Sequence, residues 1–220
     1  MNRPAVVVFA RSPERGRVKT RLAKDVGLDR ALDLHVWSGA RGVRAVTATP
    51  RTWDVYVTFT PAGACEAVTA WLPRVDDLFA QPDGDLGARI QHAVTYTFAR
   101  GHSAVVLVGT DCIAVTAERV REALGALATH DAVLGAASDG GYYLVGMNRP
   151  LDVFHDIAWS TDTVADATRA RLRDVGARWA ELPVETDVDT VGDLVSLRDV
   201  TDAPAWVRET LTGSGRGSSR

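Results

Sequence analysis

A dense group of cationic residues follows the first apolar run of the sequence. The run, Ala5 to Ala10, is rich in valine, and the segment behind it reads RSPERGRVKTRLAK. This segment contains Arg11, Gly16, Lys19 and Arg21. Cations and backbone amides that converge at the end of a strand, ahead of a helix, are suited to a pyrophosphate group. The glycine and lysine order of a Walker loop and the three-glycine dinucleotide fingerprint are both absent. A solvated basic loop is the alternative interpretation.

Aspartates follow other apolar runs. Asp111 comes directly after the run Ala104 to Val108, and Asp187 and Asp189 stand two apart in the segment TDVDT. A carboxylate beside a phosphate can hold Mg²⁺ or Mn²⁺ through one oxygen, while phosphate and water complete the octahedron. Two aspartates at this spacing share a face of an extended segment, so one can be a second metal ligand and the other structural. Helix capping is the alternative for Asp111 and for Asp189.

Two further motifs combine glycine with aspartate. They are Gly84, Asp85, Leu86 and Gly87, and then Asp139, Gly140, Gly141 and Tyr142. The first motif precedes a predicted helix, where its amides could meet a base or ribose; a plain N-cap is equally consistent. The second motif lies between two short predicted strands, where glycine lets a backbone approach a ligand closely. A tight turn is the alternative there.

The arrangement of these motifs follows from the predicted elements. Apolar or alternating runs predict strands at 5–10, 53–59, 104–108, 132–135, 142–146 and 179–182. Helical spacing predicts helices at 29–47, 64–72, 86–100, 116–129, 151–156, 161–176 and from 191 onward. Strands that alternate with helices predict an α/β protein: a single-domain, Rossmann-like, open and mostly parallel sheet with helices on both faces. Ligands of such sheets bind beyond the carboxyl ends of the strands. That rule selects the loops 11–24, 84–87, 109–111 and 187–189.

Length and composition limit the classes of protein that fit. The 220 residues predict one domain over 1–212 and a disordered Gly/Ser/Arg-rich tail over 213–220. A net charge of −3 argues against general binding of nucleic acid. Cys65 and Cys112 are too few for a disulfide framework or a zinc site. No apolar run approaches the ~18 residues of a membrane span, and no signal peptide is recognised. We therefore expect a cytoplasmic monomer or homodimer that does not bind membranes.

Six motifs, in one order, resemble a known family. They are FARSPERGRVKTRLA, GDLGARI, VVLVGTDC, ASDGGYYLVGM, FHDIAWSTDTV and DVDTVGDL. Over about residues 5–195 the chain is similar to the radical-SAM/selenodomain-associated transferase 1 family, which is glycosyltransferase-A-like. A more distant similarity is to the phospholactate guanylyltransferases of the deazaflavin-cofactor pathway. In one departure, Ile113 and Ala114 follow GTDC, where the family usually has proline.

This resemblance implies roles for individual residues. Lys19 and Arg21 would meet the nucleotide phosphates, and Asp111 and Asp189 would bind the metal. The segment from Gly84 to Gly87 would line the base pocket. The residues that would face the second substrate are Asp139, Gly140, Gly141, Tyr142, Trp159, Ser160 and Thr161.

We expect nucleotidyl transfer from an NTP to a small phosphorylated or phosphonate acceptor, with release of pyrophosphate. Mg²⁺ or Mn²⁺ on Asp111 and Asp189 would bridge the phosphates, and Lys19 would offset the charge that develops during transfer. One alternative is glycosyl transfer from a nucleotide sugar, for which Asp139 is the candidate base. Another is a protein that senses nucleotides without catalysis, and the fold alone does not choose among the three.

Overall fold

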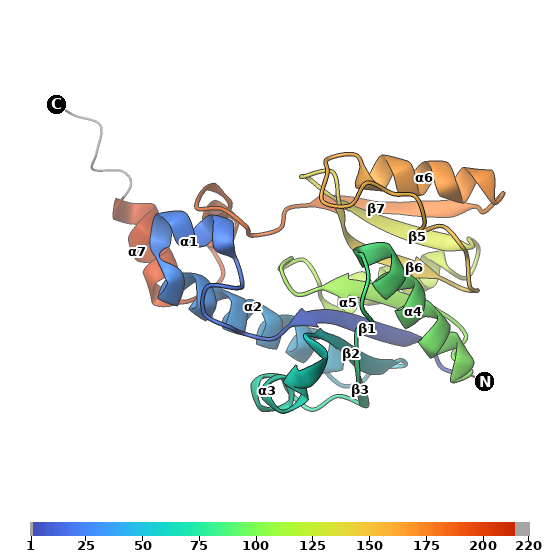
Figure 1. Cartoon of the computed structure of the whole chain (residues 1–220), viewed down its shortest axis with the longest axis horizontal. Coiled ribbons are helices and arrows are strands. Elements are labelled where there is room, and N and C mark those ends of the chain that lie inside the picture. The colour runs from blue at the N-terminus through green and yellow to red at the C-terminus, as the bar shows by residue number, and fades with distance from the viewer. Residues whose placement is uncertain (1, 214–220) are drawn as a thin grey trace.

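The computed structural model describes residues 2–213, and within them the strands form a seven-stranded sheet (Figure 1). The strands are β1 (Ala5–Arg11), β2 (Asp54–Thr60), β3 (Asp77–Ala80), β4 (Val105–Gly109), β5 (Ala132–Ala137), β6 (Tyr142–Met147) and β7 (Trp179–Glu185). Their order is β3-β2-β1-β4-β6-β5-β7. Strand β6 is antiparallel to both of its neighbours, β4 and β5, and the other neighbouring pairs are parallel. The predicted single-domain, mostly parallel α/β sheet is confirmed.

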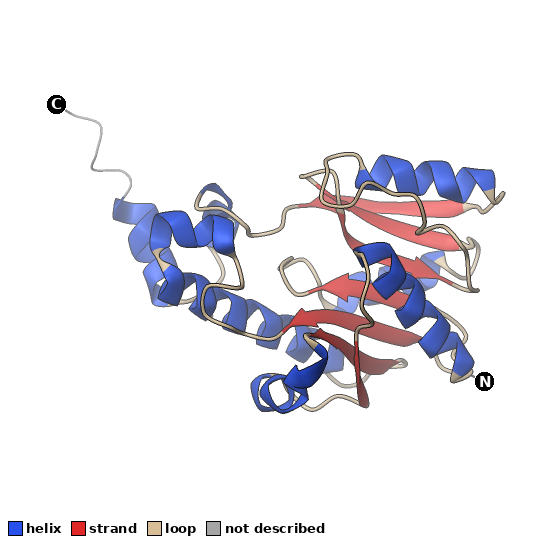
Figure 2. Ribbon diagram, viewed as in Figure 1, coloured by secondary structure: helices blue, strands red, loops and turns tan. Residues whose placement is uncertain are grey.

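Helices cover both faces of this sheet (Figure 2). The α-helices are α1 (Thr20–Val26), α2 (Leu28–Thr47), α3 (Cys65–Trp71), α4 (Leu86–Ala99), α5 (Ala117–Ala126), α6 (Val164–Asp174) and α7 (Ala205–Gly213). The 3₁₀ helices are η1 (Ala62–Ala64) and η2 (Gly192–Leu197). Side chains of α2, α3 and α5 pack in one core cluster with one face of the sheet. Side chains of α4 and α6 pack in a second cluster with the opposite face.

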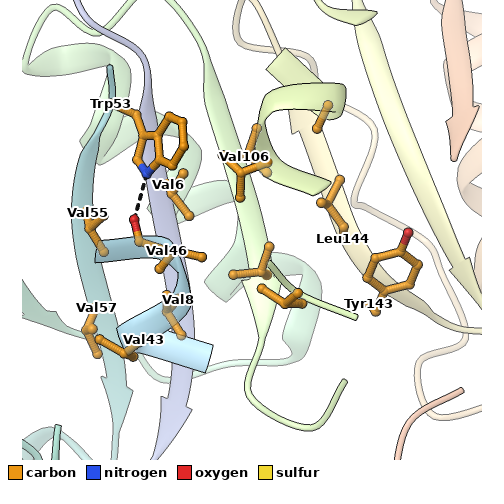
Figure 3. Packing of buried hydrophobic residues seen from close by; sticks show 14 of the residues in the cluster. Val6, Val8, Val43, Val46, Trp53, Val55, Val57, Val106, Tyr143 and Leu144 are labelled. Atoms are coloured by element: carbon orange, nitrogen blue, oxygen red, sulfur yellow. Dashed lines mark hydrogen bonds between the residues drawn. The ribbon is translucent and has the colours of Figure 1, made fainter. Parts of the chain in front are cut away.

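The core is valine-rich because each strand is covered on both sides. Val6 and Val8 of β1 point to one core cluster and Val7 points to the other, as the alternation along a strand requires. Figure 3 shows the first cluster, in which the indole of Trp53 donates a hydrogen bond of 2.9 Å to the carbonyl of Val46. This bond joins the segment before β2 to the end of α2.

A third apolar cluster lies beyond the sheet. Its buried members are Leu22, Leu34, Val188, Leu194, Leu197, Ala203 and Val207. They come from α1, the first half of α2, η2, α7 and the segments next to them. Figure 1 shows that α2 runs from the sheet into this group of helices, which we call the helical lobe. The lobe holds α1 and the segment after β7 against one another at the carboxyl edge of the sheet.

Several predicted boundaries were wrong. Residues 151–156 form a loop rather than a helix, and Asp156 at the end of this segment has a left-handed backbone (φ 53°). The helix expected from 161 begins at Val164, because the backbone of its N-cap Thr163 (φ −107°, ψ 1°) is not helical; Ser160 before it is left-handed (φ 63°). The helix expected from 191 is instead η2, followed after Pro204 by α7. Strand β3, which was not predicted, has only four residues.

Three other expectations concern parts of the chain away from the sheet. Gly213 is the last residue of α7, and residues 214–220 of the predicted tail lie outside the described residues. Cys65 and Cys112 are both free. Within the described chain, no helix combines the length and apolarity needed to cross a bilayer.

Candidate functional site

A pocket of about 440 Å³ opens where the carboxyl ends of β1 and β4 lie side by side. It is lined by Phe9, Arg11, Arg17, Val18, Lys19, Thr20, Arg21, His35, Leu86, Gly109, Thr110, Asp111 and Asp189. We call it the cationic pocket, because four cationic side chains and two carboxylates line it. It brings together residues from the four loops that the sequence selected, at the edge where ligands of such sheets bind.

Lys19 lines this pocket with a buried side chain. Its side chain is 2% exposed, and its ammonium forms an ion pair of 2.7 Å with Asp111 Oδ1. The same ammonium donates a hydrogen bond of 2.7 Å to the Val188 carbonyl and lies 3.6 Å from Asp189 Oδ1. The backbone of Lys19 is left-handed (φ 43°, ψ 47°), which costs a non-glycine residue on the order of 1 kcal/mol. The buried contacts of the ammonium offset that cost and fix the start of α1.

The carboxylates around Lys19 repel one another. Burial, and then the charges of Asp111 and Asp189, raise the pKa of Asp187 from 3.8 to about 7. Burial also raises the pKa of Asp189, against the opposing effect of Lys19. Within the described part of the chain, Asp187 Oδ1 is buried and has no hydrogen-bond partner. The three aspartates Asp111, Asp187 and Asp189 therefore share too little positive charge among themselves, and a bound cation would lower the pKa values of Asp187 and Asp189.

Capping does not account for Asp111 or Asp189. The N-cap of α5 is Thr116, whose hydroxyl accepts from the amide of Arg119. At the start of η2, the carboxylate of Asp193 binds the free backbone amides: its Oδ2 accepts from the amides of Asp189 (3.0 Å) and Thr190 (2.7 Å). The carboxylates of Asp111 and Asp189 instead face Lys19.

The chemistry of these donors fits Mg²⁺ or Mn²⁺. Such cations prefer oxygen ligands and are commonly held by one or two carboxylates together with substrate phosphates and water. Residues 2–213 contain no cluster of three or more His, Cys, Asp or Glu side chains able to hold a metal ion by themselves. Asp111 and Asp189 thus suit a cation that arrives with a phosphate ligand.

A second pocket, of about 350 Å³, adjoins the first. Its lining residues are Arg21, Leu86, Asp139, Gly141, Tyr142, Trp159, Ser160, Thr161, Asp162, Val164 and Asp187. Arg21 and Leu86 line both pockets, so the two are neighbours. We call this one the acidic pocket, because three aspartates and a single arginine line it. It brings together most of the residues that the resemblance assigns to a second substrate.

Two glycines of the predicted motifs approach the protein's own chain. Gly140 has φ 89°, and a side chain there would collide with the carbonyl of Asp162. A side chain at Gly87 would collide with the carbonyl of Phe154 and crowd the indole of Trp159. For Gly140 the expected close approach to a ligand is therefore an approach to the loop before α6. Both glycines shape the acidic pocket by packing.

Other predicted residues stand outside the pockets. Gly16, Gly84, Asp85 and Gly87 line neither of them. Asp85 is the N-cap of α4 and accepts from the amide of Ala88 at 2.8 Å, as the alternative interpretation held. Of the motif from Gly84 to Gly87, Leu86 is the residue that lines both pockets.

Several lining residues were not among the predicted site residues, and Arg17, Asp162, Phe9 and His35 are four of them. Arg17 stands in the predicted basic loop and Asp162 directly follows a predicted contact residue, so both had a signal. Phe9 and His35 had none, because a buried aromatic in a strand and a lone histidine in a helix are ordinary core residues. His35 Nε2 donates to the carbonyl of Arg11 at 2.9 Å, and burial lowers the pKa of the ring, which favours its neutral form. It supports the end of β1.

Both the sequence and the fold of the chain are similar to those of known proteins. Residues 43–161, more than half of the chain, match the model of a family described as "Uncharacterized protein conserved in bacteria (DUF2064)". The chain belongs to the DUF2064 family. No curated protein matches the sequence.

Solved structures similar to this DUF2064 protein include one with 32% sequence identity and a TM-score of 0.84. It comes from Desulfovibrio desulfuricans G20 and carries the provisional assignment of nucleotide-diphospho-sugar transferase; the match covers 98% of this chain and 96% of that one. A nucleotidyl transfer enzyme from Methanothermobacter matches at 16% identity with a TM-score of 0.59, over 91% and 98% of the two chains. A Mycobacterium tuberculosis H37Rv protein in complex with manganese matches with 18% sequence identity and a TM-score of 0.51. That match covers 89% of this chain and 98% of the other. The DUF2064 protein therefore has the fold of nucleotidyl- and nucleotide-sugar transferases.

Proposed function

We propose that this protein is a metal-dependent nucleotidyltransferase, which transfers NMP from an NTP to a small acceptor and releases pyrophosphate. The observation that carries the proposal is the buried ammonium of Lys19 between the carboxylates of Asp111 and Asp189. This arrangement lies at the carboxyl edge of a sheet whose fold is shared with nucleotidyl transfer enzymes.

The charges of the cationic pocket suit a triphosphate. Arg11, Arg17 and Arg21 join Lys19 on its lining, against the two carboxylates. A concave surface with excess positive charge attracts phosphates and offsets the charge that grows on them during transfer. In this proposal Lys19 and Arg21 contact the phosphates, and Arg11 and Arg17 attract them.

Asp111 and Asp189 hold Mg²⁺ or Mn²⁺ in this proposal. When bound, the cation neutralises phosphate charge and favours the departure of pyrophosphate. Lys19 then keeps its place beside the same phosphates, because its side chain is anchored at the carbonyl of Val188.

Glycosyl transfer from a nucleotide sugar is the second candidate. The acidic pocket favours it, since Asp139 and Asp187 can each accept a proton from a hydroxyl acceptor. The pKa of Asp187, raised to about 7 chiefly by burial, lies in the range useful for a general base. The provisional assignment of the Desulfovibrio relative points in the same direction.

Product analysis separates the candidate functions. The protein is incubated with each NTP or with nucleotide sugars, Mg²⁺ and a panel of acceptors, both phosphorylated and free. Release of pyrophosphate that is lost in Asp111→Asn supports nucleotidyl transfer. Release of a nucleoside diphosphate from a nucleotide sugar supports the second candidate. Tight nucleotide binding without either product supports a non-catalytic sensor.

A further inference from the structure

We propose that the acidic pocket takes an acceptor without a phosphate or carboxylate group: an uncharged or amine-bearing molecule with several hydroxyls, such as a sugar or an amino sugar. The inference rests on the proposed function, because it treats the cationic pocket as the nucleotide site. It replaces the phosphorylated or phosphonate acceptor that the sequence analysis expected.

The charge of the acidic pocket disfavours an anionic acceptor. Asp139, Asp162 and Asp187 line the acidic pocket, and the single lining cation is Arg21. The guanidinium of Arg21 is 3.9 Å from Asp189, on the side of the cationic pocket. An acceptor phosphate would therefore face at least two carboxylates, those of Asp139 and Asp162, with one shared counter-charge. Placing like charges together in this way rejects a ligand.

The hydrogen-bonding groups of the pocket favour an acceptor that carries donors. Asp187 Oδ1 is buried without a partner within the described residues, so it is an acceptor that lacks a donor. Burying such an oxygen destabilises the protein unless a donor meets it. Hydroxyl and ammonium groups are donors, whereas an ionised phosphate has none to offer. A ligand with several hydroxyls would satisfy this oxygen.

The aromatic rings of Tyr142 and Trp159 in the acidic pocket also favour a sugar or an amino sugar. Tyr142 and Trp159 line the same pocket and meet edge to face, with ring centroids 6.4 Å apart. The packing at Gly87 and Gly140 fixes the loops that carry these rings. Aromatic faces pack against the C–H groups of a sugar ring and attract ammonium groups. Carboxylates beside an aromatic face thus suit a polyol or an amino sugar.

The chemistry balances with such an acceptor. A hydroxyl oxygen forms a bond to the α-phosphorus, the bond between the α-phosphorus and the bridging oxygen breaks, and pyrophosphate leaves with that electron pair. The hydroxyl proton passes to a carboxylate of the acidic pocket. No oxidant or further co-reactant is required.

Fluorescence quenching of Trp159 tests the charge of the pocket without knowledge of the acceptor. The emission of Trp159 is obtained as the difference between wild type and Trp159→Phe, and it is quenched with Cs⁺, iodide and neutral acrylamide, with and without Mg²⁺ and a non-hydrolysable NTP analogue. We expect Cs⁺ to quench better than iodide, relative to free tryptophan amide. The double variant Asp139→Asn/Asp162→Asn should lower this preference by about twofold or more. Asp174→Asn, at the far end of α6, is the matched control and should leave it unchanged.

A preference for iodide would overturn the proposal. So would a preference that reverses when Mg²⁺ and the analogue are added, because the aspartates would then hold a second cation and make the pocket suitable for an anion.

Matched acceptors provide the second readout. Sugars and amino sugars are compared with their own phosphate esters, with pyrophosphate as the product. We expect free acceptors to react at least about 10-fold faster than their esters, with the difference reduced in the double variant. Faster reaction of the esters would overturn the inference. If no acceptor releases pyrophosphate, the proposed function fails, and the quenching still decides the charge of the pocket.

Discussion

At the scale of single residues, Lys19 links the fold to the proposed chemistry. Its ammonium contacts Asp111, approaches Asp189 and is buried, so it neutralises the carboxylates that are proposed to hold the divalent cation. Its left-handed backbone shows that the position is held by these contacts rather than by local preference. In the nucleotide-free protein, Lys19 should therefore compete with the metal.

Replacing Lys19 tests this competition. Lys19→Met keeps an apolar chain of similar length but leaves the two carboxylates without their cation. We expect Mn²⁺ affinity without nucleotide to rise about 10-fold, since each carboxylate then lacks a competing charge. Turnover should fall about 100-fold or more, the scale of losing one preorganised charge contact. Mn²⁺ titration by electron paramagnetic resonance measures the first effect, and a pyrophosphate assay measures the second.

Lys24, the only other lysine of the chain, is exposed in the last turn of α1 and supplies the control. Lys24→Met should change neither quantity. Unchanged or weaker Mn²⁺ binding in Lys19→Met would rule out the competition.

The raised pKa of Asp187 predicts a pH-dependent stability. The folded protein holds this proton more tightly than the unfolded chain, so the group stabilises the fold fully below pH 3.8 and loses that contribution as the pH rises through about 7. We expect the Tm of the metal-free wild type to rise, relative to Asp187→Asn, as the pH falls from about 8 to about 6. Thermal unfolding of both proteins in chelator measures it. If the curves of Tm against pH were parallel for the two proteins, Asp187 would ionise as an ordinary exposed aspartate does.

At the scale of elements, the acidic pocket depends on one loop held against another. The turn between β5 and β6 contacts the first turn of α6: the amide of Ala165 donates to the carbonyl of Gly140 at 2.9 Å. The amide of Gly141 also donates to Asp139 Oδ1 at 3.0 Å, which orients that carboxylate. The pocket is thus formed by backbone contacts between segments far apart in sequence.

Gly140→Ala should break this contact. The added side chain meets the carbonyl of Asp162, and alanine is strained at φ 89°. We expect a loss of more than about 2 kcal/mol in the free energy of unfolding. Gly42→Ala is the control: this helical glycine has nothing within 4 Å of an added Cβ, so the change should be neutral or stabilising by up to about 1 kcal/mol. Urea unfolding compares the two, and equal effects would show that the turn has room to adjust.

The sequence predicted the strands that carry the site better than the loops that complete it. The valine-rich runs of β1 and β4 indicate strands buried on both faces. Since Asp111 and the basic loop directly follow these strands, the sequence predicted that both lie at the carboxyl edge of the sheet. The loop at 151–156 was taken for a helix because its apolar spacing resembles one. Left-handed residues such as Ser160 depend on tertiary contacts, which single-sequence spacing does not contain.

At the scale of the whole molecule, the sheet and the helical lobe meet at the cationic pocket. Val188 belongs to the lobe's apolar cluster, and its carbonyl accepts from the ammonium of Lys19. Nothing in the sequence predicted this lobe, because its members are far apart along the chain. Its packing fixes the distance between α1 and Asp189, so the lobe should affect ligand binding without touching the ligand.

Truncations test the role of the lobe. Removal of residues 214–220 should leave Tm and nucleotide affinity unchanged, since the buried cluster ends within α7. Removal from Ala205 onward also deletes Val207, which is fully buried, and exposes the apolar side chains that pack on it. We expect that protein to lose several degrees in Tm and at least about 10-fold in nucleotide affinity. Equal Tm and equal nucleotide affinity in the two truncated proteins would show that the lobe does not affect the site.

The central claim is that Asp111 and Asp189 bind the metal that accompanies the nucleotide phosphates. Mn²⁺ titration in the presence of saturating nucleotide tests it most directly, in wild type, Asp111→Asn and Asp189→Asn. Asp83→Asn, an exposed aspartate outside both pockets, is the control. We predict that each of the first two variants loses at least about 10-fold in Mn²⁺ affinity, while Asp83→Asn matches wild type. Wild-type Mn²⁺ affinity in both Asp111→Asn and Asp189→Asn would contradict the account.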